Sequence, residues 1–407
     1  MKIEEDTYLY KLNDSVYEVG AKDPNRRIFD SLVYMPQGTT YNSYLIEGNT
    51  HNALIDCVDP EKIEVLISNL RAAKVDHLDY VVMLHAEQDH SGGIFTILDL
   101  YPLAKIVCTA KVKELLAIHL HLTDENMIIM KDMDILDLGG MSLTFHPIPF
   151  AHWPDNTMVF LEPQKILFSS DLFGAHYTDE NSTLVMSDIQ KKAARGYFSE
   201  IMMPFRKIIA KHIASAQLMK PAIIAPAHGA VWLDPEVIFD CYKNWISDEV
   251  IPKVTIPYLT MHQSTEKAVF YLAQHLKALG IEVELRNLTN QPESLLIETG
   301  EMIYDLVDAS AVVFAFPTVL GGPHPAIAYA AITANAMIPK TKFMGMLCSY
   351  AWASKATEVI NSVTPNFKCQ RFEPLIFKGL PTQEDFVRLE SYAKEIADAI
   401  LGKNKGL

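Results

Sequence analysis

The stretch His85-Ala86-Glu87-Gln88-Asp89-His90-Ser91-Gly92-Gly93 decides the interpretation of this chain, because it places two imidazoles and two carboxylates within six residues. It directly follows the apolar run 80–84, which reads as a strand. Imidazoles and carboxylates crowded together favour a bound cation, and this ligand mixture suits first-row metals. The glycines allow the backbone to turn sharply away after the cluster. The stretch therefore predicts a metal site.

Three further candidate ligands lie downstream, each at the end of an apolar run. They are His152 after 143–150, Asp171 after 165–170, and His228 after 222–227. A strand, then a ligand, then a turn, repeated four times, indicates ligands that converge at one edge of a β-rich domain. His146 competes with His152 for the same role, and we expect His146 to be structural.

This arrangement resembles the metallo-β-lactamase superfamily, whose motif normally reads His-x-His-x-Asp-His. In this chain Glu87 occupies the position of the second histidine of that motif. The exchange replaces a neutral donor with an anionic oxygen, which shifts the preference from zinc towards iron or manganese. It is also the departure that marks the flavodiiron proteins within that superfamily.

Composition indicates a globular protein with more than one core. A chain of 407 residues with 49% hydrophobic content is long enough for two domains. The net charge of −15 argues against nucleic acid and anionic membranes as partners. No apolar run approaches the roughly 20 residues of a membrane span, and the first six residues lack the apolar core of a signal peptide. Five scattered cysteines without a Cys-x-x-Cys pair predict a cytoplasmic protein without a fused rubredoxin module.

The periodicity changes near residue 250, where we place a domain boundary that gives domains 1–250 and 251–407. The first domain begins with strands at 16–19, 41–46 and 52–56, followed by a helix at 60–70, and it ends with a helix at 235–246. The second alternates strands (254–259, 281–286, 311–316, 342–348) with helices (264–278, 300–306, 325–336, 383–400). This alternation is typical of a parallel sheet, which binds ligands at the carboxyl ends of its strands.

Three loops at those strand ends resemble the flavodoxin pattern of one phosphate loop and two loops beside the flavin ring. Hydroxyls and free N–H groups at a helix start form an anion site. The candidate residues are Thr260, Met261, His262, Gln263, Ser264 and Thr265 in the phosphate loop, Pro317, Thr318, Val319, Leu320 and Gly321 in the second loop, and Ser349, Tyr350, Ala351, Trp352 and Ala353 in the third. Gln263 and Ala351 stand where flavodoxins commonly have glycine. The absence of a Gly-x-Gly-x-x-Gly motif favours FMN over FAD.

Together the two halves resemble the flavodiiron proteins over nearly the whole chain, and most of all the methanogen enzymes that oxidise the reduced deazaflavin coenzyme F-420. The implied fold is α/β, an N-terminal metallo-β-lactamase-like αββα sandwich followed by a flavodoxin-like doubly wound parallel sheet. The implied cofactors are FMN and two iron ions. The resemblance assigns His85, Glu87 and His152 to one iron and Asp89, His228 and His90 to the other, with Asp171 bridging. Whether His90 binds iron stays open, and His176 is a candidate proton donor.

The resemblance implies a flavodiiron oxidase that reduces dioxygen to water with electrons delivered through FMN. The donor would be reduced coenzyme F-420, with rubredoxin as the alternative. A head-to-tail homodimer, or a dimer of such dimers, would bring one chain's FMN to its partner's diiron site. A nitric oxide reductase on the same scaffold stays open. A zinc hydrolase is disfavoured by Glu87, because catalytic zinc sites of this superfamily favour histidine there.

Overall fold

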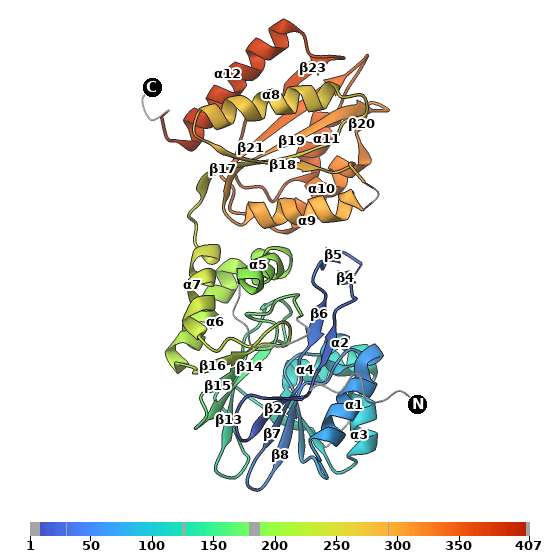
Figure 1. The fold of residues 1–407 in the computed structure, drawn as a ribbon, viewed down its shortest axis with the longest axis vertical. Coiled ribbons are helices and arrows are strands. Elements are labelled where there is room, and N and C mark those ends of the chain that lie inside the picture. Colours follow the sequence, from blue (N-terminus) through green and yellow to red (C-terminus); the bar gives the residue numbers. More distant parts are fainter. Residues whose placement is uncertain (1–8, 30, 124–126, 179–187, 292, 404–407) are drawn as a thin grey trace. The chain divides into compact units, whose positions relative to one another are not determined.

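The computed structural model describes residues 9–29, 31–123, 127–178, 188–291 and 293–403, which form two compact units (Figure 1). Unit 1 contains most of the chain up to Lys243. Unit 2 begins its main segment at Asn244 and also takes in residues 30–34 and 199–204. None of the helices in the described ranges combines the length and apolarity that crossing a bilayer requires.

Unit 1 contains two facing β-sheets. In its described part, the first sheet has the order β1 (Tyr10–Lys11), β2 (Val16–Glu18), β7 (Tyr44–Glu47), β8 (Asn52–Ile55), β9 (Tyr80–Met83), β10 (Lys105–Thr109), β11 (Ile128–Met130). The second has the order β12 (Ile135–Asp137), β13 (Ser142–Pro147), β14 (Thr157–Glu162), β15 (Ile166–Phe168), β16 (Ile223–Ala225). Buried side chains of both sheets, among them Tyr44, Leu143 and Phe168, form one core between them. The expected αββα sandwich is confirmed.

Helices cover the outer faces of these sheets (Figure 1). The helices of unit 1 are η1 (Pro60–Lys62), α1 (Ile63–Ala72), α2 (Gln88–Ser91), α3 (Ile94–Leu100), α4 (Ala110–Leu120), α5 (Asp188–Tyr197), α6 (Arg206–Met219) and most of α7 (Pro235–Ile246). The short helices η2 (Phe198–Met202) and η3 (Met203–Phe205) consist mainly of residues 199–204, which belong to unit 2. Leu66, Leu70 and Leu116 belong to the core on one of these faces. The expected helix 60–70 begins as a 3-10 turn, because Asp59 accepts a hydrogen bond from the Glu61 N–H and Pro60 opens the turn.

Two short pairs, β3 (Ala21–Asp23) with β6 (Thr39–Tyr41) and β4 (Ile28–Phe29) with β5 (Val33–Tyr34), lie outside the sandwich sheets. The prediction of a single strand at 41–46 is wrong, because residues 42 and 43 separate strand β6 from strand β7. At this break the Asn42 N–H donates to the carbonyl of Ala227 over 2.8 Å, and the Asn42 side-chain amide donates to Pro226 and Gly229. Through these hydrogen bonds, Asn42 holds the segment between β6 and β7 against the loop that carries His228.

Unit 2 is a doubly wound parallel sheet, as expected. Its order is β18 (Glu282–Asn287), β17 (Ile251–Tyr258), β19 (Ala309–Val319), β21 (Phe343–Tyr350), with β22 (Gln370–Arg371) and β23 (Leu375–Lys378) both pairing with β21 and β20 (Gly322–Pro323) forming a hairpin with β19. Helices α8 (Ser264–Ala278) and α12 (Gln383–Ile400) pack on one face, and α9 (Ser294–Leu306), α10 (Pro325–Ala336) and α11 (Ala356–Val363) lie on the other (Figure 1).

The predicted bounds of α8, α10 and α12 agree with the structure. Helix α9 starts at Ser294, six residues before the predicted start at Gly300, and α11 and β23 were not predicted. The interior glycine of α9 and the shortness of β23 explain why periodicity alone misses these elements.

Candidate dinuclear metal centre and flavin pocket

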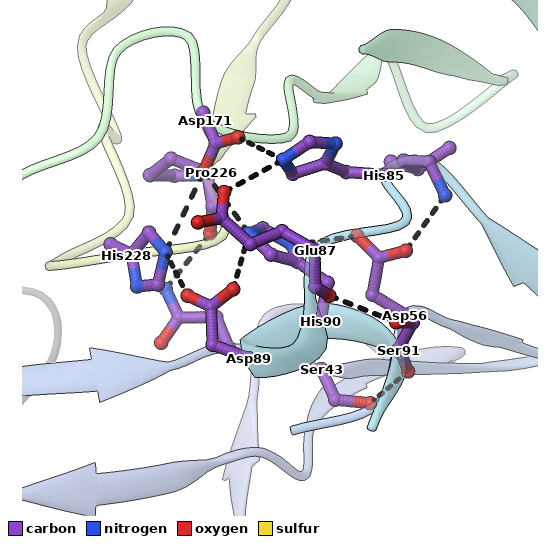
Figure 2. A network of polar contacts seen from close by, with 12 residues as sticks. Ser43, Asp56, His85, Glu87, Asp89, His90, Ser91, Asp171, Pro226 and His228 are labelled. Carbon is purple, nitrogen blue, oxygen red and sulfur yellow. Dashed lines mark hydrogen bonds and ion pairs between the residues drawn. The ribbon is translucent and has the colours of Figure 1, made fainter. Parts of the chain in front are cut away.

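The loop after β9 carries the first four candidate metal ligands. His85 follows the strand, Glu87 precedes the short helix α2, and Asp89 and His90 lie on its first turn. All four side chains point toward one another and toward Asp171 and His228 (Figure 2). Apart from Glu87, which is half-buried, these side chains are buried.

The downstream candidates come from the second sheet of the sandwich. His152 lies in the loop between β13 and β14, Asp171 follows β15, and His228 follows β16. The structure therefore brings all seven sequence-predicted ligands into one cluster. His146 lies elsewhere, with its Nδ1 atom 3.6 Å from Asp132 Oδ1.

Asp171 divides this cluster into two sets, because its two oxygens face different histidines. Asp171 Oδ2 lies 3.5 Å from His85 Nε2 and 3.4 Å from His152 Nε2. Asp171 Oδ1 lies 3.2 Å from His90 Nε2 and 3.6 Å from His228 Nε2. With one oxygen facing each histidine pair, this carboxylate could bind two metal ions at once.

One further carboxylate completes each set. Glu87 Oε2 lies 3.0 Å from His85 Nε2 and 3.4 Å from His152 Nε2. In the other set, Asp89 Oδ2 lies 3.2 Å from His228 Nε2, and Asp89 Oδ1 lies 3.7 Å from His90 Nε2. Each set thus offers two imidazoles and a carboxylate of its own.

These distances suit atoms that share a metal ion. Two ligands bound about 2.1 Å from one ion are separated by roughly 3.0–3.5 Å, whichever atoms they are. Although the Asp89 oxygens and His90 Nε2 are buried and close to ionic partners, they make no hydrogen bond of acceptable geometry. Buried polar atoms are normally hydrogen-bonded. Their close approach without hydrogen bonds indicates that the residues fit a pair of metal ions.

The electrostatics of the cluster also indicate a cation site. Burial alone would lower the pKa of His85, but the hydrogen bond to Asp155 and the charge of Asp171 raise it to about 10. For His152, burial is again outweighed, by hydrogen bonds with Asp171 and Glu87, and the pKa rises to about 9. Burial alone would raise the pKa of Glu87, but its hydrogen bonds with His152 and His85 outweigh burial and lower this pKa. Protons therefore occupy the imidazoles until a cation replaces them.

Groups behind the ligands were not predicted from the sequence. Asp155 contacts His85 Nδ1 at 3.0 Å, and Asp56 lies 3.5 Å from His90 Nδ1. His228 Nδ1 donates to the carbonyl of Thr40 over 2.6 Å, and the Tyr197 hydroxyl donates to Asp171 Oδ1 over 3.1 Å. Asp155 could have been recognised from the run His152-Trp153-Pro154-Asp155, whereas a backbone carbonyl leaves no signal in the sequence.

His176, the candidate proton donor, lies beside this cluster without joining it. Its Nδ1 is 3.0 Å from Thr39 Oγ1, and its ring packs 5.6 Å from that of His228. Burial lowers the pKa of His176 well below its usual range, helped by the nearby charge of His228. The imidazole is therefore neutral in the metal-free chain, and its buried Nε2 makes no hydrogen bond.

A cavity of about 160 Å³ lies at the carboxyl ends of the strands of unit 2. Its lining comes from all three predicted flavin loops and includes Thr260, Met261, His262, Ser264, Thr265, Pro317, Thr318, Ser349, Tyr350 and Ala351. Gly379, just after β23, also lines the cavity and was missed because β23 was not predicted. The predicted contacts Gln263, Val319, Leu320, Gly321, Trp352 and Ala353 do not line it.

The cavity fits the phosphate end of a flavin. Thr260 Oγ1 is buried without a hydrogen-bond partner. The Thr265 hydroxyl, at the start of α8, lies 3.1 Å from the hydroxyl of Ser349 in β21. Hydroxyls and free N–H groups at a helix N-terminus bind phosphate. Leu320, in the second flavin loop, is 98% exposed and Trp352, in the third, is 82% exposed, so neither of these large apolar side chains fills the pocket.

Comparison with known proteins supports both halves of this description. The family model described as ODP family beta lactamase matches residues 39–229. A coenzyme F-420-H2 oxidase of Methanothermobacter marburgensis is 32% identical over 328 residues, which cover 78% of this chain and 79% of that protein. A nitric oxide reductase of Moorella thermoacetica is 32% identical over 406 residues, covering 96% and 98%. The solved rubredoxin oxygen:oxidoreductase of Desulfovibrio gigas superposes with a TM-score of 0.91 at 27% identity, covering 98% and 100%.

The fold, the seven converging ligands and these relatives establish that the chain belongs to the flavodiiron proteins. It is an oxidoreductase whose cofactors are FMN and a diiron centre.

Proposed function

We propose that the protein reduces dioxygen to water at a diiron centre, with electrons delivered through FMN. The observation that carries the proposal is Asp171, whose two oxygens face two separate ligand sets 3.2–3.6 Å away. A pair of ferrous ions and a reduced flavin together supply the four electrons that dioxygen needs to become two waters. Residues 1–250 would hold the diiron centre and residues 251–407 the FMN.

The ligand roles follow from the two sets. His85, Glu87 and His152 would bind one iron, while Asp89, His90 and His228 would bind the other, with Asp171 between them. The distance of 3.2 Å from His90 Nε2 to Asp171 Oδ1 supports His90 as a ligand. Asp56 and the Cys57 N–H, which donates to the His90 carbonyl over 2.8 Å, hold this residue in place.

His176 would relay protons rather than store one. Its low pKa makes it a neutral group, and a neutral imidazole accepts a proton at one nitrogen while donating from the other. The contact of Nδ1 with Thr39 leaves the buried Nε2 as the atom that accepts a proton or passes it on.

The acceptor decides between two functions that share this scaffold. The Methanothermobacter relative bears the name of an oxidase and the Moorella relative that of a nitric oxide reductase, both at 32% identity. The test is steady-state turnover of the iron- and FMN-loaded protein with dioxygen and with NO, using one common donor. A higher kcat/KM for dioxygen without release of peroxide supports the oxidase, and a higher value for NO reverses the assignment.

We favour reduced coenzyme F-420 as the donor. A planar deazaflavin transfers hydride to the flavin directly and therefore needs an apolar approach to the pocket, which the exposed Leu320 and Trp352 would provide. Rubredoxin is itself a small acidic protein, and a net charge of −15 disfavours its docking.

A head-to-tail homodimer would place the FMN of one protomer beside the diiron centre of its partner. The metal ligands lie in unit 1 and the flavin loops in unit 2, and the flavodiiron resemblance implies that dimerisation brings the two cofactors together. Oxidase turnover per chain should fall steeply on dilution through the dimer dissociation constant. Full turnover by a monomer isolated at high dilution would refute the dimer.

Glu87 separates the redox function from zinc hydrolysis. Glu87→His restores the pattern His-x-His-x-Asp-His and should shift metal selectivity towards zinc. Metal analysis after growth with both metals should find two irons per wild-type chain and an increased zinc fraction in the variant. Zinc alone in the wild-type protein would support a hydrolase.

A further inference from the structure

His85 is the most tightly constrained ligand of the cluster. Its side chain is fully buried, its Nδ1 donates to Asp155 Oδ2 over 3.0 Å, and the ring of Trp153 packs edge-on against it at 5.1 Å. Asp155 Oδ2 also accepts the Ala86 N–H over 2.8 Å. One carboxylate oxygen therefore fixes both the imidazole and the backbone beside it.

Two other histidines of the cluster are supported differently. Asp56 also accepts a backbone N–H, that of Leu84 over 2.7 Å, but it lies 3.5 Å from His90 Nδ1, farther than Asp155 lies from His85. His228 donates to a neutral carbonyl, that of Thr40. A carboxylate behind a metal-binding imidazole fixes its tautomer and raises its basicity, whereas a carbonyl fixes the tautomer without adding charge.

Asp155 also connects two ligands of the same set. It lies in the loop between β13 and β14 that carries His152, so this loop supplies one ligand directly and supports another. Its side chain is fully buried, and its second oxygen, Oδ1, makes no hydrogen bond. A buried carboxylate without a full set of partners is costly, and this cost is offset when the imidazole it contacts binds a cation.

We propose that Asp155 is a positioning residue that holds His85 with Nε2 toward the metal pair, and that it makes the set of His85, Glu87 and His152 the tighter of the two iron sites. Asp155 does not touch the metal or the substrate. It acts through the hydrogen bond to His85 and through its negative charge. The inference rests on the diiron function proposed above.

The test is Asp155→Asn, which keeps an oxygen acceptor and removes the charge. Iron affinity is measured by equilibrium competition with a chelator. The wild-type protein should bind two irons of unequal affinity, and the variant should lose about 10–100-fold at the tighter site while the weaker site is unchanged. The reduction potential of one iron should shift upward, because the ferric state loses a negative charge behind its ligand.

The matched control is Asp132→Asn. Asp132 also lies beside a histidine, 3.6 Å from His146 Nδ1, but its carboxylate is 72% exposed and His146 is not one of the clustered ligands. This variant should leave both iron affinities unchanged. Wild-type affinities and potentials in Asp155→Asn would overturn the inference, whereas a wild-type protein that binds no iron would overturn the proposed function itself.

A measurement on the wild-type chain covers the case in which Asp155→Asn fails to fold. With zinc as a diamagnetic probe, nitrogen NMR of histidine-labelled protein should find His85 protonated at Nδ1 and bound to metal through Nε2. Metal bound at Nδ1 of His85, or a His85 Nδ1 without its proton, would contradict the role of Asp155.

Discussion

The metal cluster and the flavin pocket differ in the chemical groups that form them. The metal cluster consists of charged side chains that are mostly buried and face one another at 3.0–3.7 Å. Among the described residues, the lining of the flavin pocket has no acidic or basic side chain other than one imidazole, and hydroxyl-bearing residues predominate around a cavity of about 160 Å³. A site made of a few charged side chains depends strongly on the identity of each residue, whereas a pocket lined by many neutral residues depends less on any one of them. Substitutions should therefore affect the first site far more than the second.

The largest effect is expected for Asp171→Asn. The change removes the anion that faces both ligand sets, so iron should fall from two per chain to one or none, and dioxygen turnover should fall by at least about 1,000-fold, or about 4 kcal/mol. Iron analysis and oxygen-electrode assays measure the two effects. FMN content is the internal control and should be unchanged. Two tightly bound irons in this variant would show that Asp171 is not the bridge.

The second effect is the pH dependence of iron uptake. In the metal-free chain the pKa of His85 is raised to about 10 and that of His152 to about 9, so both imidazoles are protonated at pH 7. Iron must displace these protons. The apparent affinity should therefore rise with pH up to about 9, by as much as about 100-fold per unit while two protons are released. Chelator competition between pH 6 and 9 measures the slope, and a flat profile would contradict it.

The flavin pocket should respond more mildly. Thr265→Val removes a hydroxyl at the start of α8 that lies 3.1 Å from the hydroxyl of Ser349 in β21, and FMN affinity should fall about 10-fold, the value of one charge-assisted hydrogen bond. Flavin fluorescence titration measures the FMN affinity of each variant. Thr333→Val is the control, because the Thr333 hydroxyl donates within α10 to the carbonyl of Tyr329. Equal FMN affinities in both variants would place the phosphate elsewhere.

The smallest effect concerns the backbone. Gln263 has a left-handed conformation, with φ at +63°, and its side chain does not cap α8. Gln263→Gly should relieve up to about 1 kcal/mol of strain and raise FMN affinity a few-fold by allowing closer approach. Lys74→Gly, at a φ of +57° in unit 1, should relieve similar strain without changing FMN binding. Weaker FMN binding in Gln263→Gly would mean that the glutamine side chain itself holds the flavin.

The same contrast explains what could be predicted from the sequence. The seven predicted metal ligands lie in one cluster in the structure, and the sequence indicates them because His, Asp and Glu at the ends of successive apolar runs are costly to bury unless they bind a cation. Asp155 was given no role although it lies three residues after His152, because its contact with His85 joins two loops that are 70 residues apart in the sequence. In the flavin pocket the three loops were identified, but Gly379 was missed and Leu320 and Trp352 proved not to line the cavity. Those details depend on how loops fold over the sheet, which periodicity does not report.

Anaerobic stopped-flow mixing of the iron- and FMN-loaded protein with reduced coenzyme F-420, followed by mixing with dioxygen, tests the proposed oxidase reaction in a single experiment. We predict rapid reduction of FMN by the deazaflavin, then reoxidation with four electrons consumed per dioxygen and no peroxide. FMN that stays oxidised in the first mixing would contradict the assigned donor, and peroxide as the product of the second would contradict complete reduction at a diiron centre.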